Sequence, residues 1–314
     1  MNFYPLKFKP IYKELIWGGH KLRNILGKDF PADKKIGESW DLADLPNDKS
    51  IITNGEFAGK TITEILQKYP QQITGKKDYK IPFGLLIKFI DAADVLSVQV
   101  HPDAEAVKRL KTGRPKTECW YIINAEPGAC IYKGLKSGTT KEQFAQSIKA
   151  GKCAELLNKI PVKPGQCHLL PAGTAHAIAA GVLIAEIQTP SDTTFRVFDW
   201  NRLQNGKPRQ LHIEQALESI NFDQKAEDLP VTTSGRLADN EFFKIDKITA
   251  RAGTSEKIIK GTMKVIIIIS GRGQITSKDS GPVDFAKGQT ILLPEVFNGE
   301  MLFDSDTEYL SVIQ

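Results

Sequence analysis

Three short segments of the chain carry side chains suited to binding a metal ion or moving protons. Residues 97–102 read SVQVHP, residues 116–120 read KTECW, and residues 165–176 read GQCHLLPAGTAH. In the first segment Gln99 and His101 alternate with two valines, so on a strand the two polar side chains share one face. If that face points into a barrel, the pair needs polar partners, which a cation or an ordered water would supply.

The elements that position these segments are expected to be short antiparallel strands. Runs rich in Val, Ile, Leu and aromatic residues, separated by Gly and Pro, predict strands over residues 84–89, 95–100, 119–123, 167–170, 182–187, 265–269 and 290–293. The absence of a βαβ rhythm favours an all-β fold. Helices are expected over residues 103–113, 139–151, 156–160 and 213–220, the second starting at a capping box of Thr139 and Glu142.

An internal repeat predicts two related β units. PGQCHLLP at residues 164–171 matches KGQTILLP at residues 287–294, and ECWYIINAEPG at residues 118–128 matches MKVIIIISGRG at residues 263–273. Two matched blocks in the same order indicate a duplicated β-barrel. We expect a domain over residues 1–228, with a helical insertion at about 139–160, and a second domain over residues 229–314.

The third segment resembles a motif of the cupin superfamily. The motif G-x5-P-x-G-x2-H is matched by Gly165, Pro171, Gly173 and His176. The first two segments resemble the other cupin motif, with Gln99 in place of its first histidine, then His101 and Glu118. The resemblance implies a mainly β fold of two cupin-type jelly-roll barrels with a few short helices.

Longer strings resemble one enzyme family within the cupins. These are LLIKFIDAADVLSVQVHPD at residues 85–103, KTE at residues 116–118 and SDTTFRVFDWNR at residues 191–202. They are similar to the short bacterial form of class I mannose-6-phosphate isomerase, over roughly residues 8–222. The resemblance implies an aldose–ketose isomerase that interconverts mannose 6-phosphate and fructose 6-phosphate through an enediol.

The resemblance also implies one metal site per chain, with Gln99, His101, Glu118 and His176 as ligands. Two imidazoles, a carboxylate and an amide oxygen suit Zn²⁺, and without a thiolate Mn²⁺, Fe²⁺ or Co²⁺ would also fit. The matching positions of the second repeat hold Lys244, Asp246, Met263 and Gly299. We therefore expect the C-terminal barrel to lack a metal site and to have a structural role.

Three residues are the candidates for catalysis. The resemblance implies an active-site role for Arg196, although a surface ion pair with Asp192 or Asp199 is the simpler alternative. Lys116 shares the expected strand face of Glu118 and would bind phosphate or act as acid or base; otherwise it is a solvated lysine. Asp192 matches an acid proposed for proton transfer in the family.

Substrate contacts are expected from residues near the ligands. Ser97 alternates onto the face of Gln99 and would donate to phosphate. Lys88 is an unusual charge in an apolar run, which either reaches the pocket or extends outward to solvent. Trp17 and Trp40 either wall a sugar pocket or pack in the barrel core.

Composition limits the compartment and the partners. The 314 residues carry a net charge of +5 without a run of five like charges, which argues against a nucleic-acid partner. The longest dense apolar run spans residues 265–269, too short to cross a membrane. Cys119, Cys130, Cys153 and Cys167 form no CxxC pair and are expected to be reduced thiols of a cytoplasmic protein.

Two other functions remain open at this point. One is a non-catalytic bicupin that binds a sugar phosphate and uses the metal only to order its barrel. The other is a different cupin enzyme, such as a metal-dependent oxygenase or a glucose-6-phosphate isomerase. Oxygenases usually present three or more histidine-type ligands to iron, so Gln99 fits them poorly.

Overall fold

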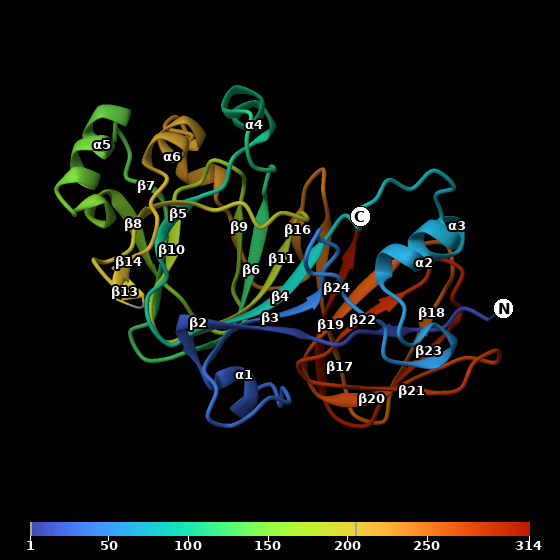
Figure 1. Ribbon diagram of the computed structural model, residues 1–314. Helices are drawn as coiled ribbons and strands as arrows, with labels where there is room; N and C mark the ends of the chain where they lie inside the picture. Colours follow the sequence, from blue (N-terminus) through green and yellow to red (C-terminus); the bar gives the residue numbers. More distant parts are fainter. Residues whose placement is uncertain (1, 205) are drawn as a thin grey trace.

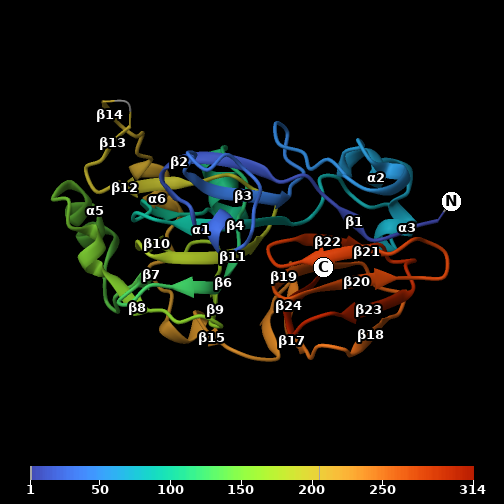
Figure 2. The same cartoon turned by 90° about the horizontal axis from the view of Figure 1, so that it is seen from below.

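Residues 2–204 and 206–314, which this computed structural model describes, form two double-layered β units that lie side by side (Figure 1). Each unit pairs a larger sheet with a smaller one, and all pairings between strands are antiparallel. Figure 2 shows the mainly green and yellow strands of the first unit beside the mainly orange and red strands of the second. The mainly β architecture expected from the sequence is confirmed.

The first unit contains the three segments with candidate ligands. Its seven-stranded sheet has the order β15 (Val231–Thr232), β9 (Cys167–Leu170), β6 (Glu118–Ala125), β11 (Val182–Gln188), β4 (Leu86–Ala92), β3 (Ile36–Leu42) and β2 (Ile11–Gly19). Its five-stranded sheet has the order β12 (Phe195–Phe198), β5 (Val98–Val100), β10 (His176–Ile178), β7 (Cys130–Leu135) and β8 (Leu157–Pro161). A hairpin of β13 (Leu203–Gln204) and β14 (Lys207–Pro208) follows β12.

The second unit repeats this plan on a smaller scale. Its six-stranded sheet has the order β1 (Leu6–Lys7), β22 (Thr290–Leu293), β19 (Lys264–Ser270), β24 (Thr307–Ile313), β17 (Lys244–Ala250) and β16 (Arg236–Asp239). Its four-stranded sheet has the order β18 (Ser255–Ile258), β23 (Gly299–Phe303), β20 (Arg272–Thr276) and β21 (Val283–Ala286). The space between these sheets is filled by apolar side chains such as Ile268, Phe285 and Tyr309.

The repeated sequence blocks occupy equivalent strands in the two units. β6 lies between β9 and β11, and β19 lies between β22 and β24. The two blocks of each repeat are therefore hydrogen-bonded neighbours. Pairing also crosses the expected boundary, because β1 joins the C-terminal sheet and β15 joins the N-terminal one. The division into domains at residue 228 stays a prediction.

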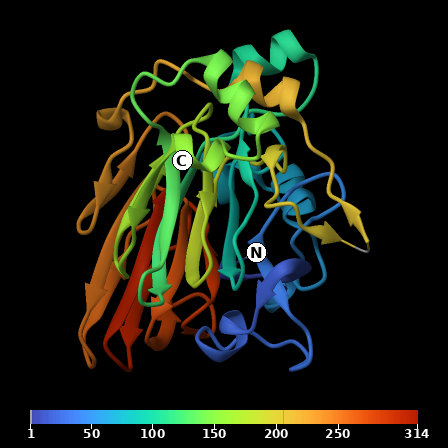
Figure 3. The same ribbon diagram turned by 90° about the vertical axis from the view of Figure 1, so that its left-hand side faces the viewer.

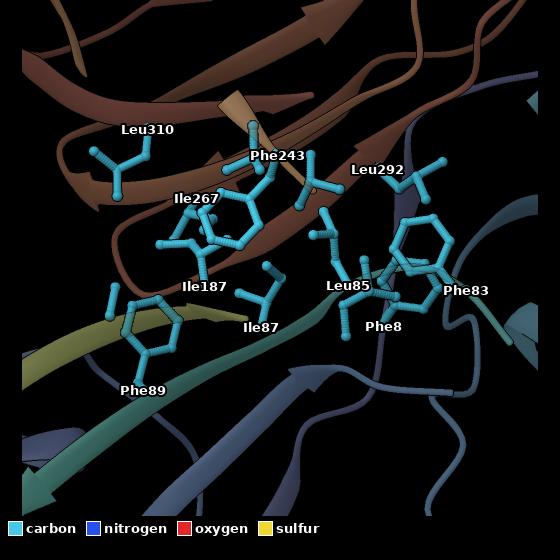
Figure 4. Close-up of a cluster of buried hydrophobic side chains, with 14 of the residues drawn as sticks. Phe8, Phe83, Leu85, Ile87, Phe89, Ile187, Phe243, Ile267, Leu292 and Leu310 are labelled. Carbon is cyan, nitrogen blue, oxygen red and sulfur yellow. The ribbon is translucent and has the colours of Figure 1, made fainter. Parts of the chain in front are cut away.

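The largest apolar core lies between the two units rather than inside either of them. The seven-stranded and six-stranded sheets each turn one face toward it. Figure 4 shows these side chains facing one another: Phe8, Phe83, Leu85, Ile87, Phe89 and Ile187 against Phe243, Ile267, Leu292 and Leu310. Because close-packed apolar contacts are lost when the sheets separate, this core fixes the two units relative to each other.

Short helices cover the ends of the β units. Helices α4 (Ala104–Leu110), α5 (Lys141–Lys149) and α6 (Ile213–Ser219) gather above one end of the first unit (Figures 1 and 3). Helices α2 (Ile62–Lys68) and α3 (Pro70–Thr74) lie against the second unit, where the Glu295 N–H donates to the carbonyl of Ile73. The remaining turns are α1 (Lys21–Asn24), η1 (Gly55–Phe57), η2 (Cys153–Leu156) and η3 (Ala226–Asp228).

Two helix predictions are wrong in detail. The capping box of α5 is formed by Thr140 and Gln143, one residue later than expected; Thr139 instead donates its hydroxyl to the carbonyl of Lys136. The expected helix over residues 156–160 is the strand β8, preceded by the 3₁₀ turn η2. β8 pairs with β7, so tertiary pairing outweighs the apolar spacing that suggested a helix.

Two expectations about class can be compared with the structure. In the part of the chain that is described, none of the helices has the length and apolar character needed to span a membrane. The four cysteines are buried and free in that same part.

Candidate active site

The candidate site lies between the two sheets of the first unit. The five-stranded sheet presents a row of polar side chains, since Gln99 on β5 is paired with His176 on β10 and with Arg196 on β12. His101 follows directly after β5. The seven-stranded sheet supplies Glu118 at the start of β6. The pairing of these strands therefore brings together residues that are up to 97 positions apart in the sequence.

His101, Glu118 and His176 converge on one point in the barrel. Nε2 of His101 lies 3.3 Å from one carboxylate oxygen of Glu118, and Nε2 of His176 lies 3.3 Å from the other. Nε2 of Gln99 lies 3.3 Å from Nε2 of His176. Among the described residues, this is the group of His, Cys, Asp and Glu side chains whose geometry would hold a metal ion.

Backbone carbonyls fix the orientation of both imidazoles. Nδ1 of His101 lies 2.7 Å from the carbonyl oxygen of Thr193, and Nδ1 of His176 lies 2.8 Å from that of Thr174. A carbonyl oxygen only accepts, so each Nδ1 carries the proton and each Nε2 presents a lone pair to Glu118. This is the second-shell arrangement that orients histidine ligands of metals.

The ionised carboxylate and the neutral imidazoles of this cluster favour a bound cation. Burial, and then the Lys116 ammonium, lower the pKa of His101 to about 3, and burial lowers that of His176. Burial opposes ionisation of Glu118, but Lys116 and the histidines outweigh it and hold the pKa of the carboxyl well below its usual range. Lone pairs of two neutral imidazoles thus face an anion. Among the described residues, neither His101 Nε2 nor the Glu118 oxygens have a hydrogen bond of good geometry, and apart from the histidines the Lys116 ammonium is the only basic group that pairs with Glu118. A divalent metal would satisfy all of these atoms.

A cavity opens next to this cluster. It is lined by Leu15, Trp17, Glu38, Lys88, Ile90, Leu96, Ser97, Gln99, Lys116, Trp120, Ile178, Glu186, Thr194, Arg196 and Arg209. The ammonium of Lys116 lies 2.8 Å from Glu118 Oε2 and joins the cavity to the ligand cluster. Of the residues expected to catalyse or bind substrate, the cavity thus contains all except Asp192. Trp40 is buried, but it is not part of the lining.

A row of side chains across the seven-stranded sheet forms the floor of the cavity. Glu186 on β11 is paired with Trp120 on one side and with Lys88 on the other. The Lys88 ammonium lies 3.3 Å from Glu186 and 3.5 Å from Glu38. Burial alone would lower the pKa of Lys88, but the carboxylates of Glu38, Glu186 and Glu118 outweigh it and raise that pKa. Lys88 therefore points inward, and the alternative of a solvent-exposed lysine is wrong.

Arg196 contributes a guanidinium at the other side of the cavity. Its Nε donates to the hydroxyl of Ser97, at 3.2 Å, and its Nη1 to the carbonyl of Gln210, at 2.9 Å. Asp192 is exposed and is not among the residues that line the cavity. Asp199 does not orient Arg196 either, because it accepts from Arg202 and Arg209.

Three charged residues of the cavity were missed from the sequence. Glu186 interrupts the apolar strand VLIAEIQ in the way that Lys88 interrupts LLIKFID, so the same signal would have identified it. Glu38 lies two residues before Trp40, but the local sequence does not distinguish it from a solvent-exposed glutamate. Arg209 reaches the cavity only through the hairpin after β12, which the sequence did not predict.

Comparison with known proteins gives concordant matches. A family model described as the catalytic domain of type I phosphomannose isomerase matches residues 6–133. The chain is 35% identical to the mannose-6-phosphate isomerase of Streptococcus mutans over 316 residues, covering 98% of this chain and 97% of that protein. It is 43% identical over 219 residues to a probable mannose-6-phosphate isomerase of Bacillus subtilis, covering 69% of this chain and 68% of that protein.

Solved structures agree with these matches. The crystal structure of the mannose 6-phosphate isomerase of Bacillus subtilis superposes with a TM-score of 0.86 at 28% sequence identity. The superposition covers 99% of each chain. The similarity therefore extends through both β units and includes the unit without the ligand cluster.

Proposed function

The chain belongs to the type I mannose-6-phosphate isomerases and interconverts mannose 6-phosphate and fructose 6-phosphate, and we propose that it does so in the cavity beside His101, Glu118 and His176. The observation that carries this assignment is the buried cluster of unsatisfied ligand atoms next to a cavity lined by cations. A metal that only ordered the barrel would not need the Lys116 ammonium 2.8 Å from its proposed ligand Glu118.

The proposed metal ligands are His101, Glu118 and His176, with Gln99 as the fourth. Turning the Gln99 amide by 180° places its oxygen where its nitrogen lies, 3.3 Å from His176 Nε2. Nitrogen and oxygen donors without sulfur suit Zn²⁺, one ion per chain. When bound, the ion would act as a Lewis acid toward the negative charge that develops on the sugar oxygens.

The remaining chemistry is proposed to come from side chains of the cavity. Isomerisation moves a proton between C2 and C1 of the sugar through an enediol, so one group must accept the proton and return it. Lys116 is our candidate, because its side-chain nitrogen lies at the junction of the cavity and the ligand cluster. It would accept the proton as the neutral amine and return it as the ammonium. Arg196 would stabilise the developing charge, while Ser97, Lys88 and Trp17 would orient the substrate.

Metal removal tests the proposal most directly. Conversion of mannose 6-phosphate to fructose 6-phosphate would be followed before chelation, after chelation and after Zn²⁺ is restored, with the bound metal counted each time. We expect activity to follow metal content, and His101→Ala to lower kcat/KM by roughly 100-fold or more because a Lewis acid supplies several kcal/mol. His20→Ala, which changes a histidine outside the cavity, is the matched control.

Full activity in chelated protein with no bound metal would overturn the metal assignment. No conversion by folded, metal-loaded protein would overturn the isomerase assignment and favour the sugar-phosphate-binding alternative. We also propose a cytoplasmic location on the basis of the four free thiols.

A further inference from the structure

Arg209 lies at the cavity although it is distant from the ligand segments in sequence. It follows β14 directly, and Figure 2 shows the β13–β14 hairpin projecting beside β12 at the end of the first unit. Both Arg209 and Arg196 line the cavity, and the Coulomb effect of Arg209 adds to burial in lowering the pKa of Arg196. Two guanidinium groups thus face one small space.

One carboxylate holds Arg209 in place. Asp199 accepts from Nε of Arg209 at 2.6 Å and also from its Nη2, a bidentate pair that fixes the plane of the guanidinium. Arg202 donates to the same carboxylate at 2.6 Å. Burial would raise the pKa of Asp199, but these two arginines outweigh it and lower that pKa. Because Nε and Nη2 are engaged by Asp199, Nη1 is the group left for a ligand.

The turn that carries Asp199 adopts an uncommon backbone conformation. Trp200 and Asn201 have φ of 58° and 57°, the left-handed region, and the Arg202 N–H donates back to the carbonyl of Asp199. A bulky residue rarely adopts this conformation, and such strain persists only where surrounding contacts enforce it. The Trp200 indole supplies one such contact by donating to the carbonyl of Leu96, at 2.7 Å.

Charge divides the cavity into two ends. At the end beside the ligand cluster, the carboxylates of Glu38, Glu186 and Glu118 pair with the ammonium groups of Lys88 and Lys116. At the other end Asp199 is the single buried carboxylate against three guanidinium groups, since Asp94, which also pairs with Arg202, is exposed. The side chains at the arginine end therefore carry an excess of positive charge that attracts a phosphate dianion.

We propose that Arg209 binds the phosphate group of the substrate through Nη1, opposite Arg196, and so selects phosphorylated over free sugars. Asp199 and the turn at Trp200 and Asn201 are positioning residues for this contact. The proposal rests on the isomerase function, and it orients the sugar with its phosphate at the arginine end and C1 and C2 toward the ligand cluster.

The test compares Arg209→Gln with Arg202→Gln in metal-loaded protein. Both changes remove one partner of Asp199, but only Arg209 lines the cavity. We expect Arg209→Gln to raise KM for mannose 6-phosphate and the inhibition constant of inorganic phosphate by about 10- to 100-fold, with kcat changed less than about threefold. Both constants for Arg209→Lys should lie between those of the wild type and Arg209→Gln. Arg202→Gln should change both constants less than about threefold.

Two results would overturn the proposal. If the inhibition constant of phosphate is unchanged in Arg209→Gln, Arg209 does not contact the phosphate group. If Arg202→Gln raises KM and the inhibition constant as much as Arg209→Gln does, the defect comes from loss of order around Asp199. Calorimetry with inorganic phosphate separates this proposal from the isomerase function, because it needs no turnover. If the protein has no isomerase activity but still binds phosphate in a way that depends on Arg209, the proposed phosphate site is upheld and the isomerase function is overturned.

Discussion

At the scale of single residues, His168 is a buried polar side chain of the first unit that belongs neither to the ligand cluster nor to the cavity lining. It lies on β9 opposite Trp120 and is fully buried, and neither ring nitrogen has a hydrogen-bond partner among the described residues. Burial, with a smaller contribution from the Lys133 ammonium, lowers the pKa of His168 to about 4. The folded protein therefore holds this ring neutral.

This buried ring makes stability depend on pH. Between about pH 6.5 and pH 4 the unfolded chain binds a proton at residue 168 that the folded chain excludes, so stability falls as the pH falls. We expect metal-free wild type to lose about 2 kcal/mol more unfolding free energy from pH 7 to pH 5 than His168→Phe does. Urea unfolding of both proteins at the two pH values measures this; equal losses would contradict it.

At the scale of elements, the sequence predicted the strands better than the helices. Strands over residues 167–170 and 290–293 match β9 and β22, because alternating or continuous apolar runs report burial in a sheet directly. The cap of α5 was displaced by one residue, since Thr139 and Thr140 each precede an acidic or amide residue at the required spacing. Only the fold decides which of the two hydroxyls accepts.

The corrected cap of α5 gives a stability prediction. The hydroxyl of Thr140 accepts from the Gln143 N–H, and the Gln143 side chain accepts from the Thr140 N–H. Thr140→Ala should lower the unfolding free energy by about 1 kcal/mol, and Thr140→Ser, which keeps the hydroxyl, should cost much less. Urea unfolding provides the measurement. Equal losses in the two variants would mean that the lost methyl group, rather than the cap, matters.

The candidate site was predictable where a motif or a lone charge identified it. The four proposed ligands and Lys116 lie in short segments with recognisable spacing, and Lys88 is conspicuous in its apolar run. Arg209 and Glu38 could not be found in this way, because their positions depend on a hairpin and on the β3–β4 pairing. Asp192 is the opposite case: it stands in a matching string, but the cavity lining does not include it, and its role in proton transfer stays a prediction.

At the scale of the whole molecule, the core between the sheets couples the two β units. Leu310 on β24 is fully buried there, so Leu310→Ala should cost about 2–5 kcal/mol through lost apolar contact and the cavity left behind. Because both units share this core, we expect one unfolding transition shifted to lower urea, with kcat/KM nearly unchanged. Circular dichroism and tryptophan fluorescence would follow this unfolding transition.

Ile259→Ala is the matched control for this change, because that side chain is 70% exposed in the second unit and should leave the transition in place. A curve for Leu310→Ala with two phases, of which only one moves, would contradict the coupling. That result would mean that each unit keeps its structure without the other.

The pairing of β1 with β22 has a consequence for the order of events on the ribosome. Leu6 and Lys7 are synthesised long before their partners Leu292 and Ile291. β1 must therefore remain unpaired while the strands between it and β22 are translated. Until β1 docks, β22 presents an open sheet edge to other nascent chains, so aggregation competes with folding most strongly in the interval before this pairing forms.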